Sequence, residues 1–91
     1  MISGERVFGR RERVIVQQVE GDSVLLDIDS GEYFTLNEVG GRVWELCDGA
    51  DTVDAIVETI CAEYDADQGT VATDVHALFD ALVGAGLVVA R

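Results

Sequence analysis

The chain has 91 residues, of which 48% are hydrophobic, and a formal net charge of -12 at pH 7. A chain of this length fits one domain with one modest core, which leaves little room for a deep active site. No apolar run approaches the roughly 18 residues of a membrane helix, and the first residues lack the hydrophobic stretch of a signal peptide. We therefore expect a folded, soluble, cytoplasmic protein with no membrane partner.

The charge is distributed unevenly along the chain. Arginines outnumber carboxylates in the first thirteen residues, whereas from Val14 onward only Arg42 and Arg91 oppose sixteen of the 18 carboxylates. A surface of this kind repels phosphate backbones and attracts cationic ligands. We expect no nucleic-acid partner, and we divide the chain into a basic, partly flexible N-terminal segment over residues 1–12 and a folded domain over residues 13–91.

The residues that could carry chemistry are few. Cys47 and Cys61 are too far apart for a C-x-x-C pair, and with the single histidine, His76, they cannot assemble a zinc site. Both cysteines fall on apolar helical positions, which predicts buried, reduced thiols. No serine or cysteine lies in a nucleophile motif that His76 could serve. We expect no enzyme activity, no cofactor and no catalytic residue.

Two further sites of chemistry are disfavoured by their sequence context. Asp22, Asp27 and Asp29 depart from the spacing of a calcium-binding loop, so we expect no metal site there. Ser30 lies in a predicted turn before a strand and not at the start of a helix, which argues against a carrier protein that bears a prosthetic arm.

The first half of the chain shows the period of strands. Residues 14–19 are rich in β-branched side chains, and residues 20–23 have the composition of a hairpin turn. In residues 24–29, Val24, Leu26 and Ile28 alternate with polar residues and predict one buried face, with Leu25 out of step. After a second turn, residues 32–36 form a third strand. An antiparallel three-stranded meander is expected.

The second half shows the period of helices. Asn37 is a good N-cap for a first helix that ends at residues 48–50, and Asp51 or Thr52 caps a second helix through Tyr64. A third helix carries apolar residues from Val71 to Leu82 and ends near residues 84–86. Residues 87–89 form a short extended piece against the core. The fold class is α+β, with the meander followed by three helices.

The strand at residues 32–36 is the best candidate for a binding surface. It lies at an edge of the predicted meander, and an edge strand offers unpaired N–H and C=O groups to which an extended peptide can add. The backbone would give affinity, while side chains of a nearby helix would form pockets for the peptide. The alternative is an ordinary covered edge.

The residues from Leu26 to Gly40, followed by Val43-Trp44-Glu45-Leu46 and Asp48-Gly49, resemble the PqqD-like family. So do residues 52–57, Tyr64, Asp74-Val75 and the closing Gly86-Leu87-Val88. The resemblance covers residues 14–89, nearly the whole chain. It implies a winged-helix-like RiPP recognition element, a peptide-binding domain that captures the leader segment of a ribosomally made precursor peptide and presents it to a leader peptidase or other modifying enzyme.

The resemblance also implies a binding site. In that family the leader is bound as an added strand beside the third strand, in the groove between that strand and the third helix. Carried onto this chain, the peptide-binding residues are Glu32, Tyr33, Phe34, Thr35, Leu36, Val71, Asp74, Val75 and Leu78. The alternative for several of them, including Phe34 and Leu36, is an ordinary core position. Asp74 and its neighbouring carboxylates could pair with lysines of a leader.

Three functions remain open, two of them within this family. A free domain of this length suits lasso-peptide production, and a chaperone role in pyrroloquinoline quinone synthesis is the alternative within the family. A winged-helix regulatory or scaffolding protein is the rival from another class. DNA binding is disfavoured because the third helix carries Asp67, Asp74 and Asp80 and no lysine or arginine.

Overall fold

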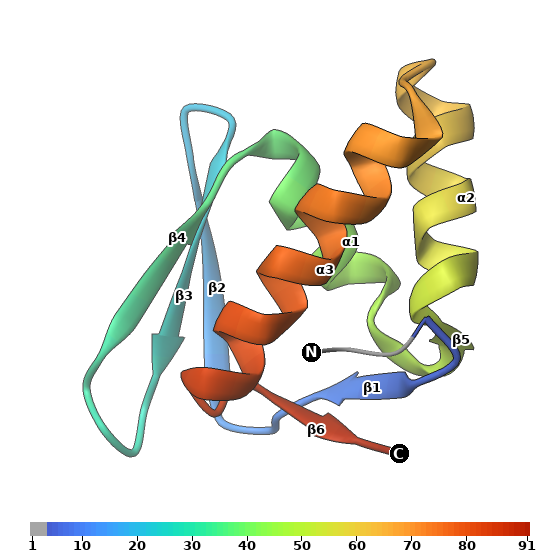
Figure 1. Ribbon diagram of the computed structural model, residues 1–91. Coiled ribbons are helices and arrows are strands. Elements are labelled where there is room, and N and C mark those ends of the chain that lie inside the picture. Colours follow the sequence, from blue (N-terminus) through green and yellow to red (C-terminus); the bar gives the residue numbers. More distant parts are fainter. Residues whose placement is uncertain (1–3) are drawn as a thin grey trace.

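The computed structural model describes residues 4–91, which form two small antiparallel sheets and three helices (Figure 1). In chain order the elements are β1 (Val7–Arg10), β2 (Val14–Val19), β3 (Asp22–Asp27), β4 (Tyr33–Leu36), α1 (Glu38–Leu46), β5 (Asp48–Thr52), α2 (Val53–Tyr64), α3 (Gln68–Gly84) and β6 (Val88–Ala90). The predicted α+β class, the meander and the three helices are confirmed; the winged-helix likeness stays a prediction.

The meander is a sheet with the strand order β2-β3-β4. Glu20 and Gly21 form the turn between β2 and β3, and both have positive φ angles, 50° and 90°. Those angles belong to the type I′ turn, whose twist matches that of the strands it joins. Val19 pairs with Asp22 beside this turn, and the register then runs without a break to Val14 and Asp27. Both β2 and β4 are edge strands of the sheet.

The buried face of β3 is opposite to the predicted one. Leu25 is fully buried and Ser23 is 3% exposed, whereas Leu26 and Ile28 are 37% and 46% exposed. Leu25 pairs with Phe34 on the core face, and Leu26 pairs with Tyr33 on the outer face. The prediction was wrong because it assumed that the more apolar side of a strand must be the buried side.

The second sheet has the order β5-β1-β6 and was not predicted. β1 lies within the basic N-terminal segment and pairs with both neighbours (Figure 1). β5 occupies residues that were expected to end the first helix, while β6 matches the predicted extended piece at the end of the chain. The division of the chain at residue 12 stays a prediction, although β1 and its buried Phe8 precede that boundary.

Arginines of the basic segment hold it against the rest of the domain. Arg10 donates to the carbonyl oxygens of Trp44 and Glu45, at the C-terminal end of α1, over 3.4 and 3.3 Å. Cationic side chains are favourable at that end of a helix because the last carbonyls have no helical partner. Arg11 donates to the carbonyl of Gly86 at 3.2 Å. These arginines have structural partners that the sequence did not reveal.

The three helices begin at side-chain caps. The side chain of Asn37 accepts from the N–H of Gly40 at the start of α1, and that of Thr52 accepts from Ala55 at the start of α2. Asp67 caps α3 by accepting from the N–H of Thr70. Each cap satisfies one of the free N–H groups of a first turn. The predicted cap Asn37 is confirmed, and Thr52 is the one of the two predicted candidates that caps α2.

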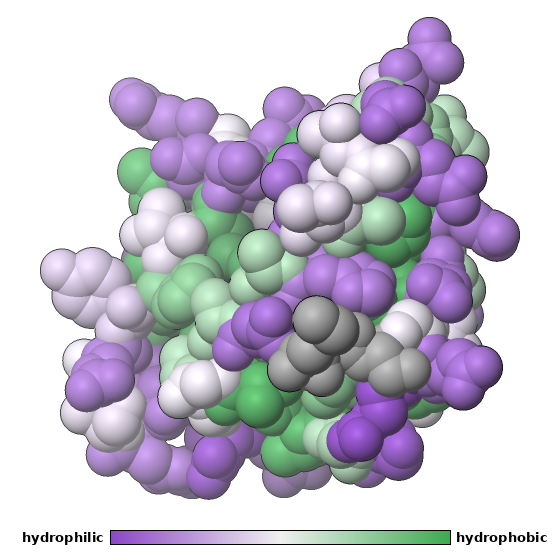
Figure 2. Space-filling model, in the orientation of Figure 1, coloured by the Kyte–Doolittle hydropathy of each residue, from purple (hydrophilic) through white to green (hydrophobic). Residues whose placement is uncertain are grey.

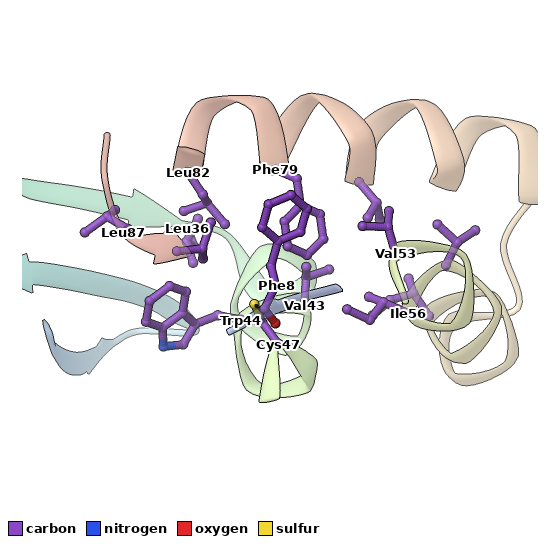
Figure 3. Close-up of a cluster of buried hydrophobic side chains, with 14 of the residues drawn as sticks. Phe8, Leu36, Val43, Trp44, Cys47, Val53, Ile56, Phe79, Leu82 and Leu87 are labelled. Atoms are coloured by element: carbon purple, nitrogen blue, oxygen red, sulfur yellow. Dashed lines mark hydrogen bonds between the residues drawn. The ribbon is translucent and has the colours of Figure 1, made fainter. Parts of the chain in front are cut away.

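The hydrophobic core lies between the two sheets and the helices. Phe8 of β1 stacks on Phe79 of α3 with ring centroids 5.2 Å apart, and side chains of all three helices pack around the pair (Figure 3). Cys47 is buried beside them, and its thiol donates to the carbonyl of Phe8 at 3.3 Å. Cys61 is a free thiol that is only partly buried. The core thus joins the unpredicted β1 to the predicted helices.

Close approach of α1 to the meander depends on glycine. A Cβ at Gly41 would lie 2.6 Å from the hydroxyl oxygen of Ser23 in β3, which is closer than side chains tolerate. Gly40 faces Leu36 of β4 in the same way, with 3.3 Å between the added Cβ and that of Leu36. Glycine at these two positions allows the backbone of α1 to lie close to the meander. This close approach holds α1 against one end of β4.

Candidate functional site: a groove beside β4

The open edge of β4 presents the backbone groups of Tyr33 and Thr35. The N–H of Asp27 donates to the carbonyl of Glu32 at 2.9 Å, so that pair of residues is hydrogen-bonded across β3 and β4. Hydrogen-bonded pairs alternate with unbonded ones along an antiparallel ladder. In the register of β4, the backbone groups of Phe34 therefore face β3, while those of Tyr33 and Thr35 point away from it. An extended peptide could bond to these outward groups.

Helix α3 forms the opposite wall of a groove along this edge. The groove has a volume of about 580 Å³ and is lined by Phe34, Thr35 and Leu36 of β4 together with Val71, Asp74, Val75 and Leu78 of α3. Figure 2 shows hydrophobic side chains gathered between β4 and α3. The structure therefore brings seven of the nine predicted site residues around one hollow.

The seven residues contribute to the groove in different ways. Leu36, Val71 and Val75 are 3%, 8% and 2% exposed, so they form its floor and belong to the core at the same time. Phe34 and Leu78 are partly buried and pack against the core from the walls. Thr35 and Asp74 are exposed. Side chains with large accessible area are thus few, and the open backbone edge is the main polar feature.

Glu32 and Tyr33 do not line this groove. They border a smaller hollow at the other end of β4, which also includes Phe34, Ala85 and Leu87. Tyr33 is 74% exposed and its side chain lies on the outer face of the sheet, opposite Leu26. Tyr33 can reach a ligand beside β4 through its outward backbone groups, whereas Glu32, whose carbonyl accepts from Asp27 of β3, can reach it only at the rim.

Several lining residues were missed by the sequence analysis. They come from α1 and its N-cap, from α2, from the loop after α2 and from the first turn of α3: Asn37, Val39, Gly40, Val43, Ile60, Tyr64, Ala66 and Thr70. Because α1 and α2 also pack against α3, the groove widens past the end of β4 into a space bounded by three helices. The apolar stripes of the helices predicted burial, but they did not reveal which ends of these stripes remain open.

Asp74 is the one charged residue among those that line the groove. Arg42 of α1 makes two hydrogen bonds to Glu63 of α2, of 2.8 and 2.7 Å, and the bond from Arg42 lowers the pKa of Glu63. A carboxylate on an otherwise apolar wall favours a ligand that carries a positive charge or a hydrogen-bond donor at that point.

The face of the meander that points away from the core is also apolar. Ile15, Leu26 and Tyr33 are register partners across the three strands on this face, and they are 51%, 37% and 74% exposed. Val19 lies on the same face and is 48% exposed. Apolar groups that gather on one exposed face, rather than standing singly, are typical of a surface that meets a partner.

The residues that were considered for a metal site or for catalysis either have partners within the protein or do not gather into a site. Asp29 pairs with Arg13 at 2.8 Å, and Asp27 accepts from the N–H of Asp29 at 3.0 Å. In residues 4–91 no three histidine, cysteine, aspartate or glutamate side chains gather as they would around a metal ion. Burial raises the pKa of the Cys47 thiol to about 11, which disfavours the reactive thiolate.

No helix within residues 4–91 has both the length and the apolar character needed to cross a membrane. The longest of the three helices, α3, carries two aspartates and a histidine along its length.

Comparison with solved structures gives two matches over nearly the whole fold. One is described as TbiB1 in complex with the TbiA(beta) leader peptide; it is 34% identical, has a TM-score of 0.76, and the match covers 88% of this chain and 93% of the other. The second, lasso peptide synthetase B1 complexed with the leader peptide, is 26% identical at a TM-score of 0.76 and covers 90% and 96%. A search of the curated proteins found no match.

The match to a protein family covers the residues that build the groove. The family model described as coenzyme PQQ synthesis protein D (PqqD) matches residues 22–88, from the start of β3 to the start of β6. This span contains β4, α3 and the three-helix end of the groove, and it confirms the resemblance seen in the sequence. The chain is a member of the PqqD family.

Proposed function

We propose that this protein captures the leader segment of a ribosomally made precursor peptide by adding it as a strand to β4. The observation that carries the proposal is the open edge of β4, where Tyr33 and Thr35 direct their backbone groups away from β3, together with the groove that Thr35 lines and α3 walls. Strand addition obtains affinity from the main chain and selectivity from side-chain pockets, and both are present here. The nine predicted residues remain the proposed contact set.

The two solved structures support this proposal. Each contains a B1 protein with its leader peptide, and each matches this chain over about nine tenths of its length. On this basis we favour a precursor from a lasso-peptide pathway. A chaperone role in pyrroloquinoline quinone synthesis is the alternative within the family, since the matching family model carries that description.

The protein itself would perform no chemical step. Binding requires only the groove and the strand edge, and the buried Cys47 is a poor nucleophile because burial raises its pKa to about 11. His76 is partly buried on α3 and is not among the residues that line the groove. The domain over residues 13–91 would therefore act as a cytoplasmic peptide-binding unit, with residues 1–12 adding β1 to it.

Presentation to a leader peptidase or another modifying enzyme needs a second surface. The apolar outer face around Ile15, Leu26 and Tyr33 is suited to this role, because it lies on the same sheet as the leader and faces away from the groove. A leader strand beside β4 would extend this sheet by one strand. An enzyme that packs on the outer face would thereby also meet the side chains of the leader that point outward.

A regulatory winged-helix protein that binds DNA is the rival from another class. The charge of -12 opposes it, and three of the six arginines already have protein partners: Arg10 and Arg11 of the basic segment, and Arg13 directly after it. A duplex-binding protein needs basic residues that are available to phosphates. Leader capture explains the groove, whereas DNA binding leaves it without a role.

A direct titration separates these functions. Fluorescent leader peptides of precursors encoded beside this gene, and the TbiA(beta) leader as a second probe, are titrated with the protein in parallel with a labelled duplex DNA. We expect saturable leader binding at micromolar concentration or below and only weak, salt-sensitive DNA binding. Tight DNA binding without any leader binding would overturn the proposal.

A further inference from the structure

We propose that Arg42 of α1 and Glu63 of α2 are positioning residues for leader binding, because the ion pair between them sets the width of the groove past the end of β4. Neither side chain lines the groove, so both act through the helices that carry them. This inference rests on the proposed function and extends it to the end of the groove that α1, α2 and α3 bound. It concerns the fit of the leader there and leaves strand addition at β4 unchanged.

The ion pair is held at two points. The Nε and Nη2 groups of Arg42 donate to the two carboxylate oxygens of Glu63 over 2.8 and 2.7 Å. Two parallel hydrogen bonds from a planar guanidinium fix the orientation of the partner as well as its distance. The two side chains are 34% and 36% exposed, so most of each is withdrawn from water. Exposed ion pairs contribute little in general, but bidentate pairs of arginine and carboxylate are the exception.

The two helices that the pair joins belong to different parts of the fold. Gly40 and Gly41 allow α1 to lie closely against β4 and β3, whereas α2 packs mainly against α3 (Figure 1). The walls of the groove are divided in the same way, with β4 and α1 in one part and α2 and α3 in the other. A link between α1 and α2 therefore sets the distance between the two parts.

The positions of the paired residues are equivalent on the two helices. Each follows one groove-lining residue by three positions and precedes another by one, so each flanks the lining face of its helix. The lining residues concerned are Val39 and Val43 of α1 and Ile60 and Tyr64 of α2. A displacement of either helix at the ion pair consequently moves side chains that line the groove.

Glu63 also needs a cation at this place. It lies in the last turn of α2, which contains no basic residue. A carboxylate there is disfavoured because the last carbonyl groups of a helix carry partial negative charge. Arg42 supplies the cation from α1, and the same turn of α2 carries Tyr64, which lines the groove. Without Arg42, repulsion would loosen the turn that holds this lining residue.

Long-range charge and positioning predict different results for the two single variants. Arg42→Gln makes the protein more acidic and Glu63→Gln makes it less acidic, so a long-range effect would shift the affinity for a charged leader in opposite directions. If the pair sets the width of the groove, both variants weaken binding. The signs of the two changes therefore separate these explanations.

Titration with a fluorescent leader peptide measures the effect. We expect Kd to rise about fivefold for Arg42→Gln, which leaves Glu63 unpaired at the helix end, and about threefold for Glu63→Gln. The double exchange of Arg42→Glu with Glu63→Arg restores the pair in reverse and should bring Kd to within about twofold of the unmodified protein. Arg13→Gln is the matched control: it removes a 2.8 Å ion pair to Asp29 that lies outside the groove and the helices, and Kd should not change.

Shortened leaders show whether the effect arises at the helical end of the groove. Leader peptides truncated stepwise from either end are titrated with the unmodified protein and with Arg42→Gln. In one of the two series the difference between the two proteins should vanish once the peptide no longer extends past β4, while binding to the strand edge persists. A role in stability alone would instead lower the unfolding temperature of the variant and leave the Kd of the folded protein unchanged.

Four results would overturn this inference and leave leader capture intact. They are opposite shifts of Kd for the two single variants, unchanged Kd for both, no recovery in the double exchange, and a difference that persists in every truncated leader. If the unmodified protein bound no leader at all, the proposed function and this inference would both be overturned.

Discussion

Thr35 of β4 stands opposite Val24 of β3 in a pair that exchanges no hydrogen bonds, so the N–H and C=O of Thr35 face the groove edge. The neighbouring residue Phe34 has the opposite arrangement, because its backbone groups bond to Leu25 within the sheet. A single backbone donor can therefore be removed at Thr35 without loss of a bond between β3 and β4.

Replacing Thr35 by proline should weaken leader binding while the sheet remains intact. One lost backbone hydrogen bond of about 0.5–1.5 kcal/mol corresponds to a Kd that rises about 2- to 12-fold. The matched control is Thr35→Val, which changes the side chain and retains the N–H. Fluorescence anisotropy with the leader peptide measures both. Equal affinities of the proline and valine variants would show that the leader does not bond to this donor.

Leu78 should contribute to leader binding through its side chain. It is partly buried on the wall of the groove, so Leu78→Ser removes apolar area that a peptide would cover, at a cost of about 1 kcal/mol or a roughly fivefold higher Kd. Val83→Ser is the control, because Val83 lies on the same helix, is 44% exposed and does not line the groove. If both variants bind equally well, α3 is not the wall that the leader contacts.

Asp74 should act mainly on the rate of association. Asp74→Asn removes the one charge that lines the groove, so at low salt the association rate of a lysine-containing leader should fall about 2- to 5-fold, with little change in dissociation. Asp80→Asn removes an exposed charge of the same helix outside the groove and serves as the control. Stopped-flow measurements at two salt concentrations give the association rate of each variant. Equal association rates for Asp74→Asn and Asp80→Asn would show that Asp74 contributes to solubility and not to leader binding.

The outer face of the meander should be needed for processing and not for capture. Leu26→Glu places a charge on this face, where Leu26 is 37% exposed and pairs with Tyr33, so leader affinity should stay within about twofold. Cleavage of the precursor by the leader peptidase of the same pathway should slow by an order of magnitude or more. Val83→Glu, on α3, is the control, and with it the leader peptidase should cleave the precursor at the normal rate. Normal cleavage with Leu26→Glu would exclude this face as the docking surface.

The sequence predicted the meander and the helices because these elements have strong local signals. Asn37 and Thr52 are good caps with apolar stripes behind them, and Gly21 marks a tight hairpin turn. Such signals depend on neighbours within a few residues. They locate an element and its type, and the family resemblance then identified which strand and helix face each other.

The error at Leu25 has a different cause. Hydrophobic alternation identifies the buried face of a strand only when the other face is polar, and here the outer face carries Leu26 and Tyr33 while the core face includes Ser23. The rule failed because the exposed outer face of the meander is itself apolar. This is the face that we propose as the docking surface for an enzyme partner. A conflict between pattern and burial is expected at functional surfaces.

β1 and the helical end of the groove depend on contacts between residues far apart in the sequence. Val7–Arg10 is too short and too interrupted by glycine and arginine to show strand periodicity, and it is stabilised by Phe8 packing on Phe79. Likewise, Tyr64 lines the groove only because α2 and α3 pack together. A single sequence contains no local signal for such pairs.

Asp67 should make the stability of the protein depend on pH. The backbone N–H of Thr70, followed by its hydroxyl, lowers the pKa of the Asp67 carboxyl, which caps α3. Because the folded-state pKa lies below the unfolded value of about 4, the stabilisation is present above that pH and is lost as the pH falls through the folded-state pKa.

Asp67→Asn keeps a capping oxygen that does not titrate. The free energy of unfolding of this variant, measured with urea from neutral to strongly acidic pH, should therefore fall less steeply below about pH 4 than that of the unmodified protein. Glu58→Gln, an exposed carboxylate on α2, is the control and should follow the unmodified curve. Parallel acid profiles for the Asp67 variant and the unmodified protein would show that the charge of this cap adds nothing to the stability of α3.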